Sequence, residues 1–585
     1  MRVASELPAR ALELARRAIA VTRRLRPFWH EPWTILVALA LLQWICLAVF
    51  AATVRHNGWL FYQGGDETYF YTSAWAVGHG HLPYAVIGYA WSLVISPITW
   101  IAGPSLLDAL PLIVLLQVVV LLPIALLSIY GIAARIGGRA IGYFAALVWA
   151  LAPYAAIPLF VERYHGKYVE QFLPQALGLT AMGDFPAMVA LLVAAYFVVR
   201  AMDEGRAVDA VIASLVTGFA IGIKPSNALF LVAPFVGLVL ARRFTALLAF
   251  AVTLAPALVT LAVWKYRGLG YLPAFKSEAL APAGGLFTPA SIAFGLPLAL
   301  LGLWRYTNLF NWNHLHNNLL AIREVFWSWR LFEYLPLAGA VAVSRRSFRN
   351  GAFLAVWFVT FFVVKGASEL ASVDSGSFWR LLMPAWPAFV LLMASIPTLI
   401  PTYGTTLAER LPAGRSRIEW RSPFLVAPVA LLVALPLVVI AAMPKLESRA
   451  ALRDTEAGLY LPVSGDLALT ATLQRDHVVL RWRHRGSAGV RVFYRVYRTP
   501  LVTPASRGVP WWIGAKEGVR CEPVNPGAAN CLLDLTLIAT TRSTRYIDRP
   551  PRGRWSYRIG EAANWRDDLT MGDVILLSQA ANVSP

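Results

Sequence analysis

The sequence predicts an α-helical domain that crosses a membrane many times, followed by a separate β-sandwich domain. Of the 585 residues, 58% are hydrophobic and only 14% are charged, whereas soluble domains carry about 25% charged residues. About eleven apolar runs of roughly span length precede residue 444. From residue 445 onward, polar sequence with strand-like alternation replaces them.

The charge of the chain points to membrane topology and not to nucleic acid. The formal net charge is +20, which in a soluble protein would favour nucleic-acid binding. Here the arginines gather at the ends of apolar runs, as in membrane proteins. The mean hydropathy of +0.58 agrees. We therefore expect a cell-membrane protein and no nucleic-acid partner.

The chain begins with a basic segment, residues 1–33, which contains seven arginines. It suits either an interfacial helix or a tail attracted to lipid head groups. The first apolar run, 34–54, is long enough to span a bilayer and lacks a small-residue cleavage site. We interpret it as a membrane anchor, and residues 34–443 as the transmembrane domain.

The other apolar runs complete the predicted membrane domain. They are 111–132, 140–159, 186–202, 209–223, 227–241, 245–264, 331–343, 351–365, 382–401 and 424–443. A cytoplasmic N-terminus puts five arginine-bearing turns inside: 135–139, 200–206, 242–243, 345–349 and 410–421. Counting 289–303 as a further span would break this pattern, so we treat it as interfacial or re-entrant. Residues 445–585 are then extracytoplasmic.

The last domain alternates apolar and polar residues over 467–473, 478–483, 491–497, 554–559 and 573–577. With the segments "LTATLQRDHVVLRW", "FYRVYRT" and "YIDRPPRGRWSYRI", it resembles a fibronectin type III domain, with Trp482 expected in the core. The insertion at 500–535 departs from that family. Its Cys521 and Cys531 could form one disulfide in an oxidising compartment, or remain unpaired.

An acidic pair follows the first span on the outer side. In "GGDETYFYTSAW", Asp66 and Glu67 lie among aromatic residues that include Tyr69. Carboxylates near a membrane surface are costly to desolvate, and such groups serve as bases or metal ligands. The alternative is a solvated acidic turn that begins the next helix.

A second outer segment carries cations. Arg163, His165 and Lys167 could hold a phosphate, because cationic side chains give its oxygens charge-assisted hydrogen bonds. Asp184 opens the next span two residues before Pro186, and it could equally be a helix N-cap.

Two more cations lie at the outer ends of spans. Lys224 precedes Pro225 between two apolar runs, where a snorkelling lysine is the ordinary explanation. Arg380 stands at the entrance of a late span.

The third outer segment contains His314 and His316, whose i, i+2 spacing does not suit a zinc site on a helix.

The order of these motifs resembles the GT-C superfamily of membrane glycosyltransferases, nearest to the protein O-mannosyltransferase and aminoarabinose transferase type. The resemblance covers residues 34–443. It rests on the acidic pair with Tyr69, on Asp184 before Pro186, on Lys224 with Pro225, and on Arg380 followed by two prolines. No motif in the third outer segment aligns with the family.

The resemblance implies a reaction in which a sugar moves from a polyprenyl-phosphate carrier to an acceptor hydroxyl at the outer face, with inversion. Asp66 would be the general base. Glu67 would shape the site or support a divalent metal. Cations aimed at the lipid phosphate would stabilise the leaving group. The candidates are Lys224, Arg380, Arg163, His165 and Lys167; Tyr69 and Asp184 complete the substrate site.

Three other functions stay open at this point. A transporter of lipid-linked sugars would be expected to show inverted repeats, and the halves show no convincing repeat. A polysaccharide polymerase or ligase would depend on a late outer loop, with Arg305, His314 and Arg330 as its candidates. A receptor or scaffold that displays the β-sandwich would need none of these residues.

Overall fold

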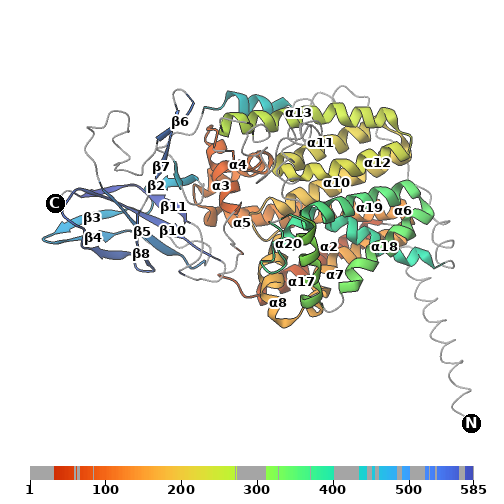
Figure 1. The fold of residues 1–585 in the computed structure, drawn as a ribbon, viewed down its shortest axis with the longest axis horizontal. Helices are drawn as coiled ribbons and strands as arrows, with labels where there is room; N and C mark the ends of the chain where they lie inside the picture. The colour runs from red at the N-terminus through yellow and green to blue at the C-terminus, as the bar shows by residue number, and fades with distance from the viewer. Residues whose placement is uncertain are drawn as a thin grey trace, which may run out of the picture.

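The computed structural model has a helical part and a sheet part. It describes residues 32–57, 61, 66–83, 85–269, 272, 311–326, 329–368, 370–400, 434–444, 451–454, 460–483, 490–500, 521–525, 528–533, 536–564, 569 and 574–583. The sheets lie at one end of the helical part, on the side of α3 and α4 (Figure 1). A helical membrane-type domain followed by a sheet domain is the predicted fold class.

The helical part consists of long apolar helices joined by short helical turns, which are labelled η. In chain order the elements are α2 (Pro32–Thr53), α3 (Asp66–Gly78), α4 (Ala90–Ala102), α5 (Leu106–Leu116), η1 (Gln117–Leu121), α6 (Leu122–Gly137), α7 (Arg139–Ala155), η2 (Ile157–Leu159), α8 (Glu162–Lys167), η3 (Tyr168–Phe172), α9 (Leu173–Ala176), α10 (Asp184–Glu204), α11 (Ala207–Ile223), η4 (Pro225–Leu231), α12 (Val232–Leu240), α13 (Phe244–Leu269), α17 (Trp312–Val325), α18 (Trp329–Arg346), α19 (Phe348–Gly366), α20 (Ser377–Leu382), η6 (Met383–Ala385), α21 (Trp386–Ser395) and η7 (Ile396–Leu399).

Helices cover the predicted apolar runs. Within the described ranges, six helical stretches are long and apolar enough to cross a membrane, and three shorter apolar helices accompany them. The last run, 424–443, is helical over its described part, 434–442. Residues 289–303 lie outside the described residues. The structure therefore supports a multi-pass protein, while the number of eleven spans stays a prediction.

One apolar helix, α4, lies in what the sequence analysis treated as an outer loop. It has only 13 residues and contains Pro97, so at 1.5 Å per residue it is too short to span a bilayer. It packs against α3 and α5. The predicted first outer segment is therefore a helical layer.

The central helix is α10, which is buried on nearly all sides. It packs against α6, α11 and α12. A helix that is apolar all round suits such a position. Its 21 residues span about 30 Å, so its two ends can lie at opposite faces of a membrane.

Basic turns meet at the C-terminal end of α10. Arg135 bonds to Glu204 at 2.9 Å, and Arg349 bonds to Asp203 at 2.8 Å. Arg243 donates to the carbonyl oxygen of Asp203 at 3.3 Å. Four of the five arginine turns predicted to be cytoplasmic supply residues here or next to them, and the fifth, 410–421, lies outside the described residues. The grouping at one end is what the positive-inside rule requires.

The sheet part contains two sheets. Its strands are β1 (Ala451–Asp454), β2 (Tyr460–Ser464), β3 (Thr470–Gln474), β4 (His477–Arg481), β5 (Phe493–Pro500), β6 (Cys521–Asn525), β7 (Ala528–Leu533), β8 (Thr536–Thr541), β9 (Arg545–Asp548), β10 (Trp555–Ala562), β11 (Val574–Ser578) and β12 (Ala581–Val583). One sheet has the order β6-β7-β1-β2-β11-β10-β5-β8, with β12 paired to β10, and the other is β3-β4-β9.

Trp482 lies where the sequence predicted it, in the core of this domain. It follows β4 and packs edge to face on Tyr494 of β5, with ring centroids 5.5 Å apart. This contact joins the two sheets as in a sandwich. The predicted strands correspond to β3, β4, β5, β10 and β11. The fibronectin type III resemblance and the domain boundary at 445 stay predictions.

The insertion forms strands β6 and β7. Cys521 and Cys531 are directly opposite each other in this antiparallel pair. Their side chains lie outside the described part, so a disulfide between them stays an open question. The remaining cysteine, Cys46, is a free thiol on α2.

Candidate functional site

Helix α3 divides the acidic pair between surface and interior. Acidic residues are favoured in the first turn of a helix, and Asp66 and Glu67 occupy the first two positions of α3. The side chain of Asp66 is 36% exposed, whereas Glu67 is fully buried. The Glu67 carboxylate accepts the N–H of Ala181 at 2.7 Å. Glu67 therefore holds the backbone at Ala181, and Asp66 is the more exposed of the two carboxylates.

Asp184 and Lys224 form a buried ion pair. Asp184 begins α10 and is 2% exposed. Lys224 ends α11 in an extended conformation, which the following Pro225 imposes by steric clash. Its Nζ lies 2.5 Å from Oδ1 of Asp184. The Asp184 carboxylate thus binds a cation, and the structure records no side-chain cap at the preceding Gly183.

Gly183 allows α10 to begin close to α3. A Cβ at this position would lie 2.5 Å from the ring of Phe70, well inside van der Waals contact. Because α3 and α10 approach so closely here, Asp66 and Asp184 are brought to the same place.

Arg380 joins the two carboxylates. From α20, its Nη2 forms an ion pair with Asp66, and its Nε bonds to Oδ2 of Asp184 at 3.2 Å. Four of the predicted site residues therefore meet, although they come from four separate segments. We call Asp66, Asp184, Lys224 and Arg380 the charged cluster.

Lys365 is a neighbour of the charged cluster that the sequence analysis missed. It lies at the end of α19, is 1% exposed, and interacts electrostatically with Asp184 and Lys224. The charged cluster itself holds two cations, Lys224 and Arg380, for its two carboxylates. The sequence signal was a single lysine in "FFVVKG", which is easily taken as the end of a span.

The other predicted cations belong to a neighbouring helix, α8. Arg163 pairs with Glu324 of α17 at 3.5 Å, and both side chains are exposed. His165 contacts the carbonyl oxygen of Phe160 at 2.9 Å. Lys167 is half-buried beside Gly376. The recorded contacts of Arg163 and His165 thus hold α8 in place and lie outside the charged cluster.

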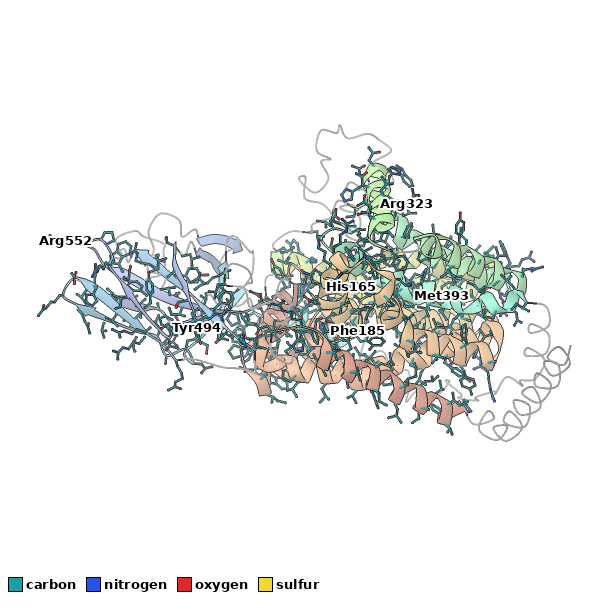
Figure 2. All side chains as sticks on the ribbon, turned by 90° about the horizontal axis from the view of Figure 1, so that it is seen from below. His165, Phe185, Arg323, Met393, Tyr494 and Arg552 are labelled. Atoms are coloured by element: carbon teal, nitrogen blue, oxygen red, sulfur yellow. The ribbon has the colours of Figure 1, made fainter. Side chains whose placement is uncertain are left out.

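Tyr69 lies one turn after Asp66 on α3 and is half-buried. Residues three apart on a helix share a face, so Tyr69 borders the charged cluster. Figure 2 shows Phe185, the residue after Asp184, inside the helical part and nearer the sheets than Met393.

A cavity of about 380 Å³ lies beside the cluster. Its walls are apolar or aromatic and come mainly from α7 and α21, with Leu151 and Phe389 as representatives; α18 adds Leu335. Trp379, the residue before Arg380, also lines it. Helix α20 therefore separates an apolar cavity from a charged cluster.

Tyr164 holds α20 in place between the cavity and the charged cluster. Its hydroxyl accepts from Nε1 of Trp379 at 2.9 Å and donates to the carbonyl oxygen of Val373 at 2.5 Å. Burial raises the pKa of Tyr164 well above its usual value, although the bond from Trp379 opposes this. The hydroxyl therefore stays protonated and keeps both bonds.

The described residues do not fit a divalent-metal site. They contain no group of three or more histidine, cysteine or acidic side chains that could hold a metal ion. Asp66 and Asp184 both pair with cationic side chains, and Glu67 turns inward to Ala181.

Comparison with known proteins gives structural neighbours only. No protein-family model matches the chain, and no curated protein matches it. Among solved structures, the chain is similar to the archaeal oligosaccharyltransferase AglB from Archaeoglobus fulgidus. The complex with an inhibitory peptide and a dolichol-phosphate has 15% identity and a TM-score of 0.37, covering 71% of this chain and 56% of that chain.

Two further structures of this oligosaccharyltransferase match equally. The apo form has 14% identity and a TM-score of 0.38, covering 70% of this chain and 55% of that chain. The form tethered to an acceptor peptide has 15% identity and a TM-score of 0.37, covering 71% and 55%. The matched region spans just over half the length of these neighbours. The function is therefore argued from the site.

Proposed function

We propose that this chain is a membrane glycosyltransferase of the GT-C type. It transfers a sugar from a polyprenyl-phosphate carrier to an acceptor hydroxyl at the outer face of the membrane. The observation that carries the proposal is the charged cluster beside an apolar cavity. A lipid phosphosugar has the same two parts, an anionic head and a hydrocarbon tail.

The cations suit the phosphate of the donor. When the bond between the sugar and the phosphate breaks, negative charge develops on the phosphate oxygens. Arg380 and Lys224 are positioned to stabilise this charge by charge-assisted hydrogen bonds. The hydrocarbon tail would enter the cavity lined by Trp379, because apolar surface is stabilised by leaving water.

Asp66 suits the role of general base. The acceptor oxygen attacks the anomeric carbon, the carbon–oxygen bond to the phosphate breaks, and the hydroxyl proton passes to the Asp66 carboxylate. The lipid phosphate leaves with the bonding electron pair, and because the acceptor attacks from the opposite face in a single displacement, the configuration at the anomeric carbon inverts. Asp66 is the accessible carboxylate of the cluster, since Asp184 is 2% exposed.

The outer face is the side that the charge distribution supports. Asp184 lies at one end of α10, and the arginine turns gather at the other end. If the arginines mark the cytoplasmic side, then the charged cluster and the sheet domain are extracytoplasmic. The donor and the acceptor would meet there.

The test is a transfer assay with a radiolabelled polyprenyl-phosphate sugar and purified full-length protein. Replacing Asp66→Asn should reduce transfer by about a hundredfold or more, the range for loss of a general base. His314→Ala is the control, because His314 contacts the carbonyl oxygen of Ala371 at 2.9 Å, outside the charged cluster. Retained transfer in Asp66→Asn with loss in His314→Ala would favour a polymerase or ligase instead. Movement of label across the bilayer without transfer would favour a transporter.

A further inference from the structure

We propose that Arg380 controls when Asp66 can act as a base. Its guanidinium pairs with the Asp66 carboxylate until the phosphate of the donor replaces that carboxylate as its partner. This inference rests on the function proposed above. It adds an order of events, in which the donor binds before Asp66 becomes free to accept a proton.

The recorded contacts show Asp66 in a form that is poorly suited to catalysis. Its carboxylate pairs with Nη2 of Arg380. A cation bonded to a carboxylate stabilises the ionised form and weakens its attraction for a proton. Asp66 must therefore lose this partner before it can take the proton of an acceptor.

The contacts of Asp66 and Asp184 determine which carboxylate Arg380 releases. Asp184 is 2% exposed and has Lys224 at 2.5 Å as a second cationic partner, so it stays paired when Arg380 moves. Asp66 is 36% exposed, so water can solvate it once the ion pair opens. Partly exposed ion pairs are weak. The ion pair of Arg380 with Asp66 is therefore weaker than its ion pair with Asp184.

A phosphate is a stronger competitor for Arg380 than a second carboxylate. The guanidinium presents a planar set of donors that binds phosphate oxygens in pairs. Lys224 provides a second cation next to it, on the same Asp184 carboxylate. A phosphate entering beside Trp379 would therefore draw Arg380 away from Asp66.

The test measures binding of farnesyl phosphate to the purified full-length protein by calorimetry or tryptophan fluorescence. Asp66→Asn removes the competing carboxylate, so farnesyl phosphate should bind about fivefold more tightly, the ratio expected for a partly exposed ion pair. Asp374→Asn is the matched control. Asp374 is exposed and lies six positions before Arg380 in the chain, and the change in net charge is identical, so binding should change by less than twofold.

The outcomes separate this inference from the proposed function. Unchanged or weaker binding in Asp66→Asn overturns the exchange. An equal gain in Asp374→Asn also overturns it, because general electrostatics would then explain the effect. Unchanged binding in Arg380→Gln contradicts both proposals, since Arg380 would not contact the phosphate. Tighter binding with full transfer in Asp66→Asn would overturn this inference, because Arg380 would then release a carboxylate that is not the base. Asp66→Ala replaces Asp66→Asn if that variant is not monodisperse.

Discussion

One buried side chain, Asn57, bonds the segment after α2 to the sheet part. Its amide nitrogen donates to the carbonyl oxygens of Arg491 and Asn564, both at 2.9 Å. Its amide oxygen accepts the N–H of Arg491 at 2.9 Å. Asn57 is 5% exposed, so water cannot readily replace these bonds.

Replacing Asn57→Ala removes these bonds from one N–H and two carbonyl oxygens; the bond to Asn564 is buried, and the two bonds to Arg491 are partly buried. At about 1 kcal/mol for each bond, the substitution should destabilise the contact between this segment and the sheet part by about 3 kcal/mol. Since 1.4 kcal/mol is a factor of ten, the amide of Arg491 should exchange with solvent about a hundredfold faster. Hydrogen exchange measured by mass spectrometry on the peptide containing Arg491 gives this rate directly.

The control is Asn317→Ala, which removes an exposed asparagine from α17 and should leave exchange at Arg491 unchanged. Asn57→Asp keeps an acceptor for the N–H of Arg491 but loses both donor bonds. Exchange at Arg491 should therefore be faster in Asn57→Asp than in the unmodified protein. If exchange at Arg491 in Asn57→Ala stays within threefold of the unmodified protein, the three bonds do not hold this contact and the reasoning is wrong.

Two further predictions concern the site and the topology. Glu67→Ala should lower the unfolding temperature in detergent, because the buried N–H of Ala181 loses a charged acceptor worth about 1.5–3 kcal/mol. Glu67→Gln keeps an acceptor oxygen and should lower the unfolding temperature less. Equal effects of the two substitutions would contradict the role of Glu67 as the acceptor of this bond. In intact cells, a membrane-impermeant maleimide should label Asp374→Cys but not Arg242→Cys, both at exposed positions, and the reverse pattern would place the charged cluster in the cytoplasm.

The sequence predicted the members of the charged cluster because each interrupts or ends an apolar run. A polar side chain near a bilayer needs a partner, which made Asp66, Asp184, Lys224 and Arg380 candidates. Their contacts could not be predicted. Lys224 is 40 positions from Asp184, and Arg380 is 196 positions away, so only the packing of α3, α10 and α20 brings them together.

The differences from the sequence analysis have physical reasons. Lys365 ends an apolar run, where a lysine usually reaches the membrane surface, but here its side chain is buried. Helix α4 is short and contains Pro97, so it gave no span-length signal. The capping and catalytic interpretations of Asp66 looked alike in sequence, because a helix start favours acids for either reason; the ion pair with Arg380 is visible only in the fold.

The two consecutive residues Trp379 and Arg380 connect the two halves of the proposed donor site. One lines the apolar cavity and the other enters the charged cluster, from neighbouring positions about 100° apart around one helix. A turn of α20 about its axis would move both side chains together. Recognition of a hydrocarbon and recognition of an anion are thus mechanically linked, and a lipid whose charge lies farther from its chain could be accommodated only by rebuilding this helix.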